Sequence, residues 1–310
     1  MSFSYETKLE LCRLPVRKPC CALAEAYGIL LYCNTFQPGE IRIVTENEAF
    51  AERLPVLFRK AFRVTFDTLP EPNQPGKRIF RMNREDKLRL VLGALGYDLR
   101  QNPVLHINFA LLEEDCCRAS FLRGAFFAGG SVTDPAKRYH LELTTSHAQV
   151  GRELEVLLRD MGHPLKSLQR NGSFISYCKQ SEQIEDFLTL IGAPVAAMRV
   201  MEAKMEKGLR NTVNRRTNCD SANLDKAVEA AQGQLYAIRK LREAGALKGL
   251  PDKLQVTAAL RLEYPELSLS ELAEEFDPPV TKSCLNHRLR KLMELARAME
   301  NMSGNGGGEG

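Results

Sequence analysis

The chain has 310 residues and the composition of an ordinary soluble globular protein, which is enough for two domains or slightly more. Its formal net charge of +4 is small, so any affinity for nucleic acid must come from local clusters of basic residues. No apolar run approaches the roughly 18 residues that a membrane span needs. The first residues carry charges where a signal peptide needs an apolar stretch, so we expect a cytoplasmic protein without a membrane partner.

The nine cysteines include no Cys-x-x-Cys pair, the spacing typical of zinc or redox sites. Two adjacent pairs occur, Cys20-Cys21 and Cys116-Cys117. Neighbours on a helix point about 100° apart, so an adjacent pair supplies poor joint metal ligands. We therefore expect mostly buried thiols, with no metal and no cofactor.

An internal duplication decides the predicted fold. The stretch CCALAEAYGILLYCNT at residues 20–35 is matched by CCRASFLRGAFFAGGS at residues 116–131, a shift of 96. After each of these helices comes an alternating, strand-like segment, at 40–46 and at 139–146, and then another helix. Two further strand-like segments and a closing helix complete each copy, with Asn171-Gly172 as a hairpin turn in the second. The sequence predicts an α-β-α-β-β-α unit present twice, at about 20–96 and 116–192.

Small residues lie on one face of the first helix in each copy. They are Ala24 and Gly28 in the first copy and Gly124 and Ala128 in the second. Small side chains let two helix backbones approach closely. We expect these two motif helices to pack together along a pseudo-twofold axis, with the strands of both copies forming a saddle.

The C-terminal region shows the pattern of a helix-turn-helix. Residues 222–245 and 251–266 predict two helices, and Ser268 with Glu271 forms a capping box at the start of a third. A DPPVT turn follows, and Thr281 can cap a fourth helix that extends to about Met299. The buried stripe of this fourth helix is predicted to be Leu285, Leu289, Leu292, Ala296 and Met299.

The opposite face of the fourth helix is polar and basic. In a helix-turn-helix this helix enters the major groove, where Asn can pair with adenine and Arg with guanine. Lys282 and Lys291 are better suited to phosphates. The alternative is a solvated basic face on a helical bundle. The candidate DNA contacts are Lys282, Ser283, Asn286, His287, Arg290 and Lys291.

Residues 196–222 predict a helix, to about residue 209, followed by a basic, Asn-rich linker between the domains. From Arg199 to Arg216 there are six Lys or Arg against two Glu. The segment is either a soluble connector or a strip that contacts phosphate, with Arg215 and Arg216 as donors; we favour the second. Residues 301–310 are rich in glycine and predict a disordered tail.

The duplicated region resembles the LAGLIDADG homing endonucleases. Residues 122–130 align with the nine-residue motif, and residues 26–34 form a more degenerate copy. In the active enzymes the eighth motif residue is an acid that holds divalent metal, and such cations require oxygen ligands. Here those positions are Gly129 and Cys33, and neither Asp134 nor Glu25 is placed to replace them. The resemblance therefore implies the endonuclease scaffold without nuclease activity.

The whole chain resembles the WhiA family of sporulation and cell-division regulators from Gram-positive bacteria. The resemblance rests on FLRGAFFAGGSV (121–132), NRRTNCDSAN (214–223) and LSLSELAEEFDPPVTKSCLNHRLRKL (267–292). It implies an α+β LAGLIDADG-like domain (1–195), the helix and linker (196–222) and an all-α helix-turn-helix domain (223–300). Cys33 departs from this pattern, where Asp or Asn is expected.

The family implies a non-enzymatic, nucleoid-associated transcriptional regulator that binds double-stranded DNA at promoters. Cell division, chromosome segregation and sporulation are the processes it would serve, as a monomer, with RNA polymerase or another regulator as a partner. Two alternatives stay open. One is an active metal-dependent endonuclease, and the other is a saddle that acts mainly as a protein-interaction module.

Overall fold

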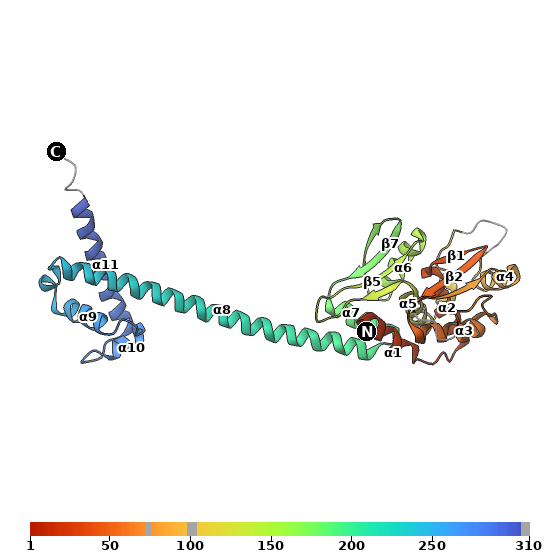
Figure 1. The fold of residues 1–310 in the computed structure, drawn as a ribbon, viewed down its shortest axis with the longest axis horizontal. Helices are drawn as coiled ribbons and strands as arrows, with labels where there is room; N and C mark the ends of the chain where they lie inside the picture. The colour runs from red at the N-terminus through yellow and green to blue at the C-terminus, as the bar shows by residue number, and fades with distance from the viewer. Residues whose placement is uncertain (72–75, 98–103, 305–310) are drawn as a thin grey trace. The chain divides into compact units, whose positions relative to one another are not determined.

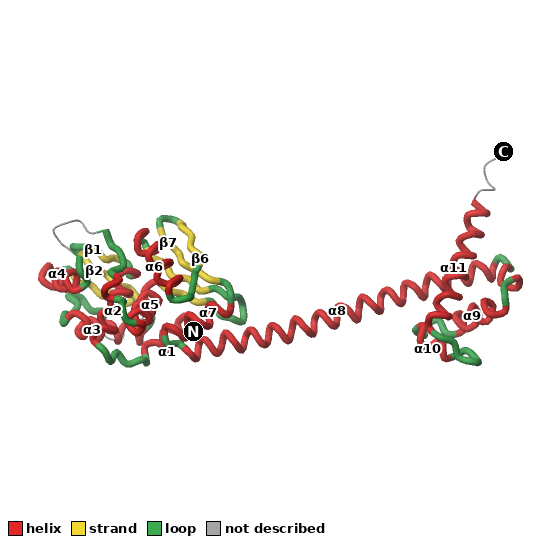
Figure 2. The backbone as a smooth tube through the Cα atoms, turned by 180° about the vertical axis from the view of Figure 1, so that it is seen from behind, coloured by secondary structure: helices red, strands yellow, loops and turns green. Residues whose placement is uncertain are grey.

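The computed structural model describes residues 1–71, 76–97 and 104–304. The chain divides into two compact units, Met1–Gly208 and Leu209–Gly310, which are described separately (Figures 1 and 2). The first unit carries two antiparallel sheets, with strand orders β1-β2-β3 and β4-β5-β7-β6. The strands are β1 (Thr35–Gln37), β2 (Glu40–Thr45), β3 (Arg78–Met82), β4 (Gly130–Val132), β5 (Leu141–Thr145), β6 (Lys166–Arg170) and β7 (Ser173–Cys178).

The two copies of the duplication are present, and each contains a short strand after its motif helix that the sequence pattern did not predict. A short strand, β1 or β4, follows each motif helix directly and pairs with the next strand. Three residues are too few to show the alternation by which strands are recognised in a sequence. The helices of the first unit are α1 (Phe3–Cys12), α2 (Pro19–Tyr32), α3 (Glu48–Phe62), α4 (Glu85–Ala94), η1 (Phe109–Leu111), α5 (Asp115–Gly129), α6 (Ala148–Asp160) and α7 (Ser181–Ile191).

The second copy has both strands of the predicted hairpin, whereas the first has one strand there among its described residues. Strands β6 and β7 are joined by Asn171 and Gly172, both with positive φ, as the Asn-Gly turn signal predicted. In the first copy Thr68 makes an isolated antiparallel bridge with Arg81 of β3. This bridge corresponds to the pairing of β6 with β7 in the second copy. The first copy thus keeps a single bridge where the second has a pair of strands.

The motif helices α2 and α5 pack against each other through their glycines, as predicted. A Cβ atom built on Gly28 would overlap the carbonyl oxygen of Phe121 and lie 2.8 Å from the backbone nitrogen of Ala125. A Cβ on Gly124 would overlap the carbonyl oxygen of Glu25 and lie 3.0 Å from the nitrogen of Ile29. The backbones therefore touch at two symmetry-related points, and only glycine fits at either one.

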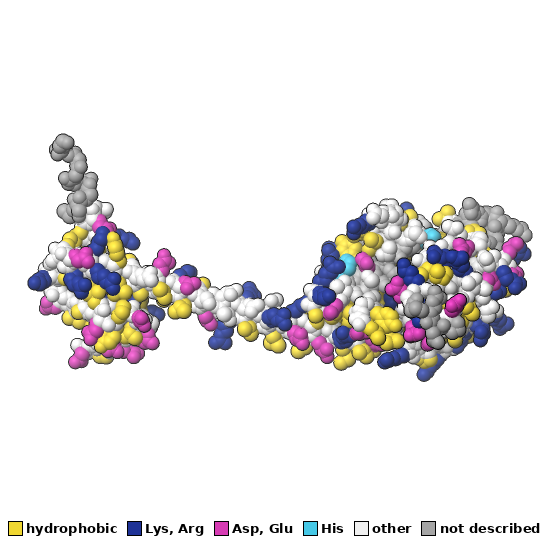
Figure 3. Space-filling model, viewed as in Figure 1, with side chains coloured by type: hydrophobic (Ala, Val, Ile, Leu, Met, Phe, Trp, Pro, Cys, Tyr) yellow, Lys and Arg dark blue, Asp and Glu magenta, His cyan; other side chains and the backbone are white. Residues whose placement is uncertain are grey.

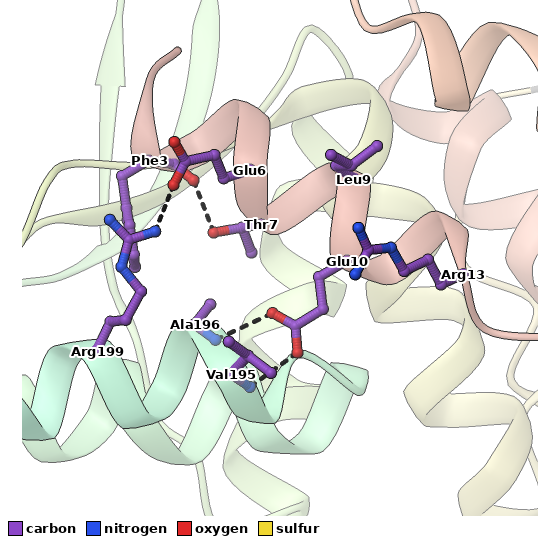
Figure 4. Close-up of a pocket in the computed structure, with 9 residues that line it drawn as sticks. All are labelled: Phe3, Glu6, Thr7, Leu9, Glu10, Arg13, Val195, Ala196 and Arg199. Carbon is purple, nitrogen blue, oxygen red and sulfur yellow. Dashed lines mark hydrogen bonds and ion pairs between the residues drawn. The ribbon is translucent and has the colours of Figure 1, made fainter.

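Helix α1, which the sequence pattern did not predict, anchors the start of helix α8 (Pro194–Glu243). The carboxylate of Glu10 accepts hydrogen bonds from the backbone nitrogens of Val195 and Ala196, at 2.8 and 3.0 Å (Figure 4). Arg199 forms an ion pair with Glu6, and its guanidinium carbon lies 4.8 Å from the centre of the Phe3 ring. A negative charge at a helix N-terminus is stabilising, so Glu10 fixes where α8 begins.

Helix α8 continues through the segment that the sequence predicted as a linker. Residues 210–222 are helical, and their side chains are exposed. Asn and Thr lower helix propensity by only a few tenths of a kcal/mol each relative to the best residues, a weak preference that context overrides. The Asn-rich composition was therefore a poor guide to irregular backbone here.

The second unit is helical, as predicted, and its elements are η2 (Ala246–Gly249), α9 (Asp252–Glu263), α10 (Leu269–Glu274) and α11 (Lys282–Gly304). Ser268 and Glu271 form the complete capping box, and the backbone nitrogen of Cys284 donates to Thr281 Oγ1 at 3.2 Å. Helix α11 includes residues 301–304, which were expected to be tail, and residues 305–310 lie outside the described part of the chain. The core of this unit comprises Ala237, Ile238, Leu241, Ala258, Leu272, Ala273, Phe276, Leu285, Leu289, Leu292 and Ala296.

Candidate functional site

Helix α11 has one buried and one exposed face. Leu285, Leu289, Leu292 and Ala296 are buried and Met299 packs against the same core, so the predicted stripe is confirmed. The six predicted contact residues on α11 are all exposed: Lys282, Ser283, Asn286, His287, Arg290 and Lys291. Between residues 282 and 297 the helix carries five Lys or Arg and a single Glu. The geometry thus leaves a polar, basic helix face free for a ligand.

The two basic side chains at the centre of this face share one acidic neighbour. Arg290 Nε lies 3.4 Å from Glu294 Oε1, and Lys291 Nζ lies 3.7 Å from Glu294 Oε2. All three side chains are half or more exposed, and exposed ion pairs on a helix contribute only a few tenths of a kcal/mol. A phosphate could therefore replace Glu294 as the partner of Arg290 and Lys291 at little cost in free energy.

Two arginines that sequence reasoning missed position the helix-turn-helix. Arg261 is 2% exposed and donates from Nη1 to the carbonyl oxygen of Leu267 at 2.6 Å, which holds the chain just before α10. Arg288 lies on α11, with its guanidinium carbon 5.6 Å from the centre of the Phe276 ring. An Arg in a charged surface sequence resembles any other, so the sequence offered no signal for either contact.

Arg215 and Arg216 lie on α8, and both are exposed. Because they are neighbours on a helix, their side chains leave it about 100° apart and cannot both donate hydrogen bonds to the same phosphate group.

The Lys and Arg side chains of the second unit gather near the middle of its visible face, while most of its acidic side chains lie toward its lower edge in this view (Figure 3).

At the C-terminal end of α5 there is no room for a side chain at Gly129. A Cβ on Gly129 would overlap the carbonyl oxygen of Thr144 and lie 2.9 Å from Tyr32 Cδ1. At the other helix end, the Cys33 thiol donates to the carbonyl oxygens of Leu30 and Thr35, each at 3.2 Å. Burial raises the pKa of the Cys33 thiol to about 12, so at neutral pH this position carries a neutral, hydrogen-bonded thiol in place of a carboxylate.

The nearby acids have other roles. Glu25 is 1% exposed and is held by two arginines: Arg53 contacts both carboxylate oxygens, at 2.6 and 3.0 Å, and Arg123 contacts one at 3.2 Å. Asp134 accepts a hydrogen bond from the backbone nitrogen of Ala136 in the loop after β4. Glu25 is thus a buried structural anion, and Asp134 lies in the loop beyond β4 and not at the end of the motif helix.

The four paired cysteines lie closer together than their sequence positions suggested. Each adjacent pair meets the pair from the other copy, and the four Sγ atoms lie within 4.8 Å of one another. The two pairs are 96 residues apart in the sequence, so the geometry of a single helix does not predict that they meet. Within the described residues, no helix is long and apolar enough to span a membrane.

Comparison with known proteins gives consistent matches along the chain. Residues 213–296 match the family model described as "WhiA C-terminal HTH domain", and residues 118–210 match "WhiA LAGLIDADG-like domain". A "Probable cell division protein WhiA" from Ruminiclostridium cellulolyticum is 37% identical over 308 residues, covering 96% of this chain and 97% of the relative. One of the same name from Desulforudis audaxviator is 40% identical over 305 residues, covering 96% and 97%.

A solved structure shares the fold over nearly the whole chain. Full-length DUF199/WhiA from Thermatoga maritima superposes with a TM-score of 0.58 at 24% identity, covering 96% of this chain and 99% of that one. At this identity the match concerns the fold alone.

Proposed function

Because this chain belongs to the WhiA family, whose C-terminal domain is a helix-turn-helix (HTH) domain, we propose that it binds double-stranded DNA at promoter sites and regulates transcription. Its relatives are named as probable cell division proteins, and we propose the same process for this chain. Chromosome segregation and sporulation are the related programmes that its target genes would serve.

The observation that carries the proposal is the exposed face of α11. Asn286 and Arg290 lie one turn apart on it, opposite the buried leucines. A helix in the major groove presents such a pair to neighbouring base pairs, since Asn matches adenine and Arg matches guanine with two hydrogen bonds each. Lys282 at the start of the helix and Lys291 beside Arg290 would contact phosphates. The arrangement therefore supports both recognition of sequence and general affinity.

We assign no nuclease activity to the first unit. Gly129 has no space for a side chain, and the Cys33 thiol is bonded to backbone carbonyls. Two carboxylates at these positions are what a divalent metal would require. The saddle is proposed to contact DNA or another protein, such as RNA polymerase, without chemistry of its own. A pull-down with the full chain separates these two roles by whether DNA or a protein is recovered. Loss of the recovered partner from a variant at the exposed sheet residue Arg81 would show that the sheet makes the contact.

The test is binding of the full-length chain to a selected DNA site and to random DNA across a salt series. Asn286→Ala and Arg290→Ala should each lose roughly 1–3 kcal/mol for the selected site and relax the preference at one base position. Lys282→Ala should weaken all sequences alike and reduce the salt dependence by about one counterion.

Arg242→Ala is the charge-matched control, because Arg242 is an exposed arginine on α8 rather than on α11. It should lose less affinity than Arg290→Ala and keep the base preference. If Asn286→Ala and Arg290→Ala bind the selected site as the parent does, α11 does not read DNA. The function would then have to be sought on α8 or in the first unit.

A further inference from the structure

Four cysteine side chains converge where α2 and α5 begin, at the other end of the helix pair from Gly129. Cys20 and Cys21 are the second and third residues of α2, and Cys116 and Cys117 are the second and third residues of α5. Their Sγ atoms all lie within 4.8 Å of one another. We propose that these four thiols bind one Zn²⁺ ion and so join the two copies of the duplication. The proposal is independent of DNA binding.

The spacing of the sulfur atoms fits a single tetrahedral ion. Zinc–sulfur bonds of about 2.3 Å place the corners of a tetrahedron about 3.8 Å apart, so sulfurs already within 4.8 Å need only small side-chain rotations. An iron–sulfur cluster holds its thiolates farther apart, because several iron and sulfide atoms stand between them. Four thiolates without nitrogen or oxygen ligands are a ligand set that structural zinc uses.

The surroundings of the cluster favour the negative charge of a zinc tetrathiolate. The N-terminal ends of two helices meet there, and each carries partial positive charge from its unpaired backbone N–H groups. Neither Lys18, the N-cap of α2, nor Glu114, the N-cap of α5, makes a side-chain hydrogen bond to the backbone of its helix. Lys18 adds a full charge, with its Nζ atom 4.0 Å from Cys116 Sγ.

Zinc binding requires all four sulfur atoms as thiolates. The positive charge of Zn²⁺ would replace the thiol protons, which leave to solvent without any change of oxidation state.

The site is both rigid and open to solvent. The close contacts at Gly28 and Gly124 fix the spacing of the two helices, so the sulfur atoms are held near their positions before an ion arrives. Cys117 is 3% exposed, whereas Cys20 is exposed. An ion can therefore enter from the side of Cys20 and end in contact with a buried thiolate.

The experiment measures zinc in the full-length chain purified under reducing conditions, with metal content determined by mass spectrometry. One equivalent of zinc per chain is expected. Replacement by Co²⁺ should give the visible bands and the sulfur-to-cobalt charge-transfer band of a tetrahedral thiolate site. Cys20→Ser should weaken retention against a chelating indicator by more than the roughly 10–100-fold that loss of an outer-shell partner costs.

Cys20 is exposed, so Cys20→Ser should leave the fold intact, and a circular dichroism spectrum checks this. Cys219→Ser is the matched control, because Cys219 is an exposed thiol on α8 outside the cluster, and it should keep the full equivalent of zinc. Zinc retained equally by Cys20→Ser and the parent would overturn the proposal. So would a parent protein without cobalt bands, or one whose non-reducing peptide map shows a disulfide between the two cysteine pairs in place of bound zinc.

Discussion

Replacing Gly124 by Ala tests the contact that holds the two halves of the first unit together. A methyl group at this position would overlap the carbonyl oxygen of Glu25 and lie 2.9 Å from its carbonyl carbon and 3.0 Å from the nitrogen of Ile29. All three atoms belong to the backbone of α2, so no side chain can rotate away. The helices must separate, and every side chain packed along them must shift.

The expected cost follows from two opposing terms. Overpacking of a tight core costs typically 1–3 kcal/mol. Ala favours a helix over Gly by about 1 kcal/mol, which offsets part of that loss. The net destabilisation of up to about 2 kcal/mol should lower the melting temperature by up to roughly 8 °C for a unit of this size.

Gly93→Ala is the matched control, since Gly93 lies in α4 of the same unit and a Cβ there meets no atom within 4 Å. It should gain a few tenths to about 1 kcal/mol, because only the helix-propensity term applies. The assay is thermal unfolding followed by circular dichroism, with hydrogen exchange of peptides from residues 115–129. If Gly124→Ala melts at or above the parent, as Gly93→Ala should, the close helix contact is not present in solution.

Three further changes test the ends and interior of the same helix pair. Glu25→Gln removes the buried anion between two arginines and should cost about 3–5 kcal/mol in urea unfolding; parental stability would show that the ion pairs do not matter. Gly129→Asp should lower the melting temperature and give no DNA cleavage with Mg²⁺ or Mn²⁺, and metal-dependent cutting by this variant would contradict the closed geometry. At pH 8 the partly buried Cys33 thiol, with its pKa raised to about 12, should react with iodoacetamide far more slowly than the exposed Cys219; equal rates in peptide mapping would contradict the raised pKa.

The sequence predicted those features that repeat or that obey local rules. The duplication fixed the order of the helices and the pairing of α2 with α5, because a shift of 96 residues can be read directly. The capping box at Ser268 and the Asn171-Gly172 turn were also recognisable, since each depends on residues that are near neighbours. In such cases the interaction and its sequence signal span the same few residues.

The features that sequence reasoning missed depend on contacts between distant residues. Helix α1 shows no strong amphipathic pattern, and it matters because Glu10 meets the start of α8 more than 180 residues later. The cysteine cluster needs both copies of the repeat, and each pair alone has poor geometry for a metal. The helical backbone of residues 210–222 was missed for a related reason: composition describes each residue alone, whereas a helix that has begun continues at little cost per residue.

In the motif helices, the residues that make the helix contact differ from the residues at the eighth motif position. Packing depends on Gly28 and Gly124, where the backbones touch, and catalysis in the resembling endonucleases depends on the eighth motif position, where this chain has Gly129 and Cys33. These demands fall on different turns of the same helices. Gly28 and Gly124 cannot change without moving the backbone, so the helix contact is set by these two glycines and not by the residues at 33 and 129.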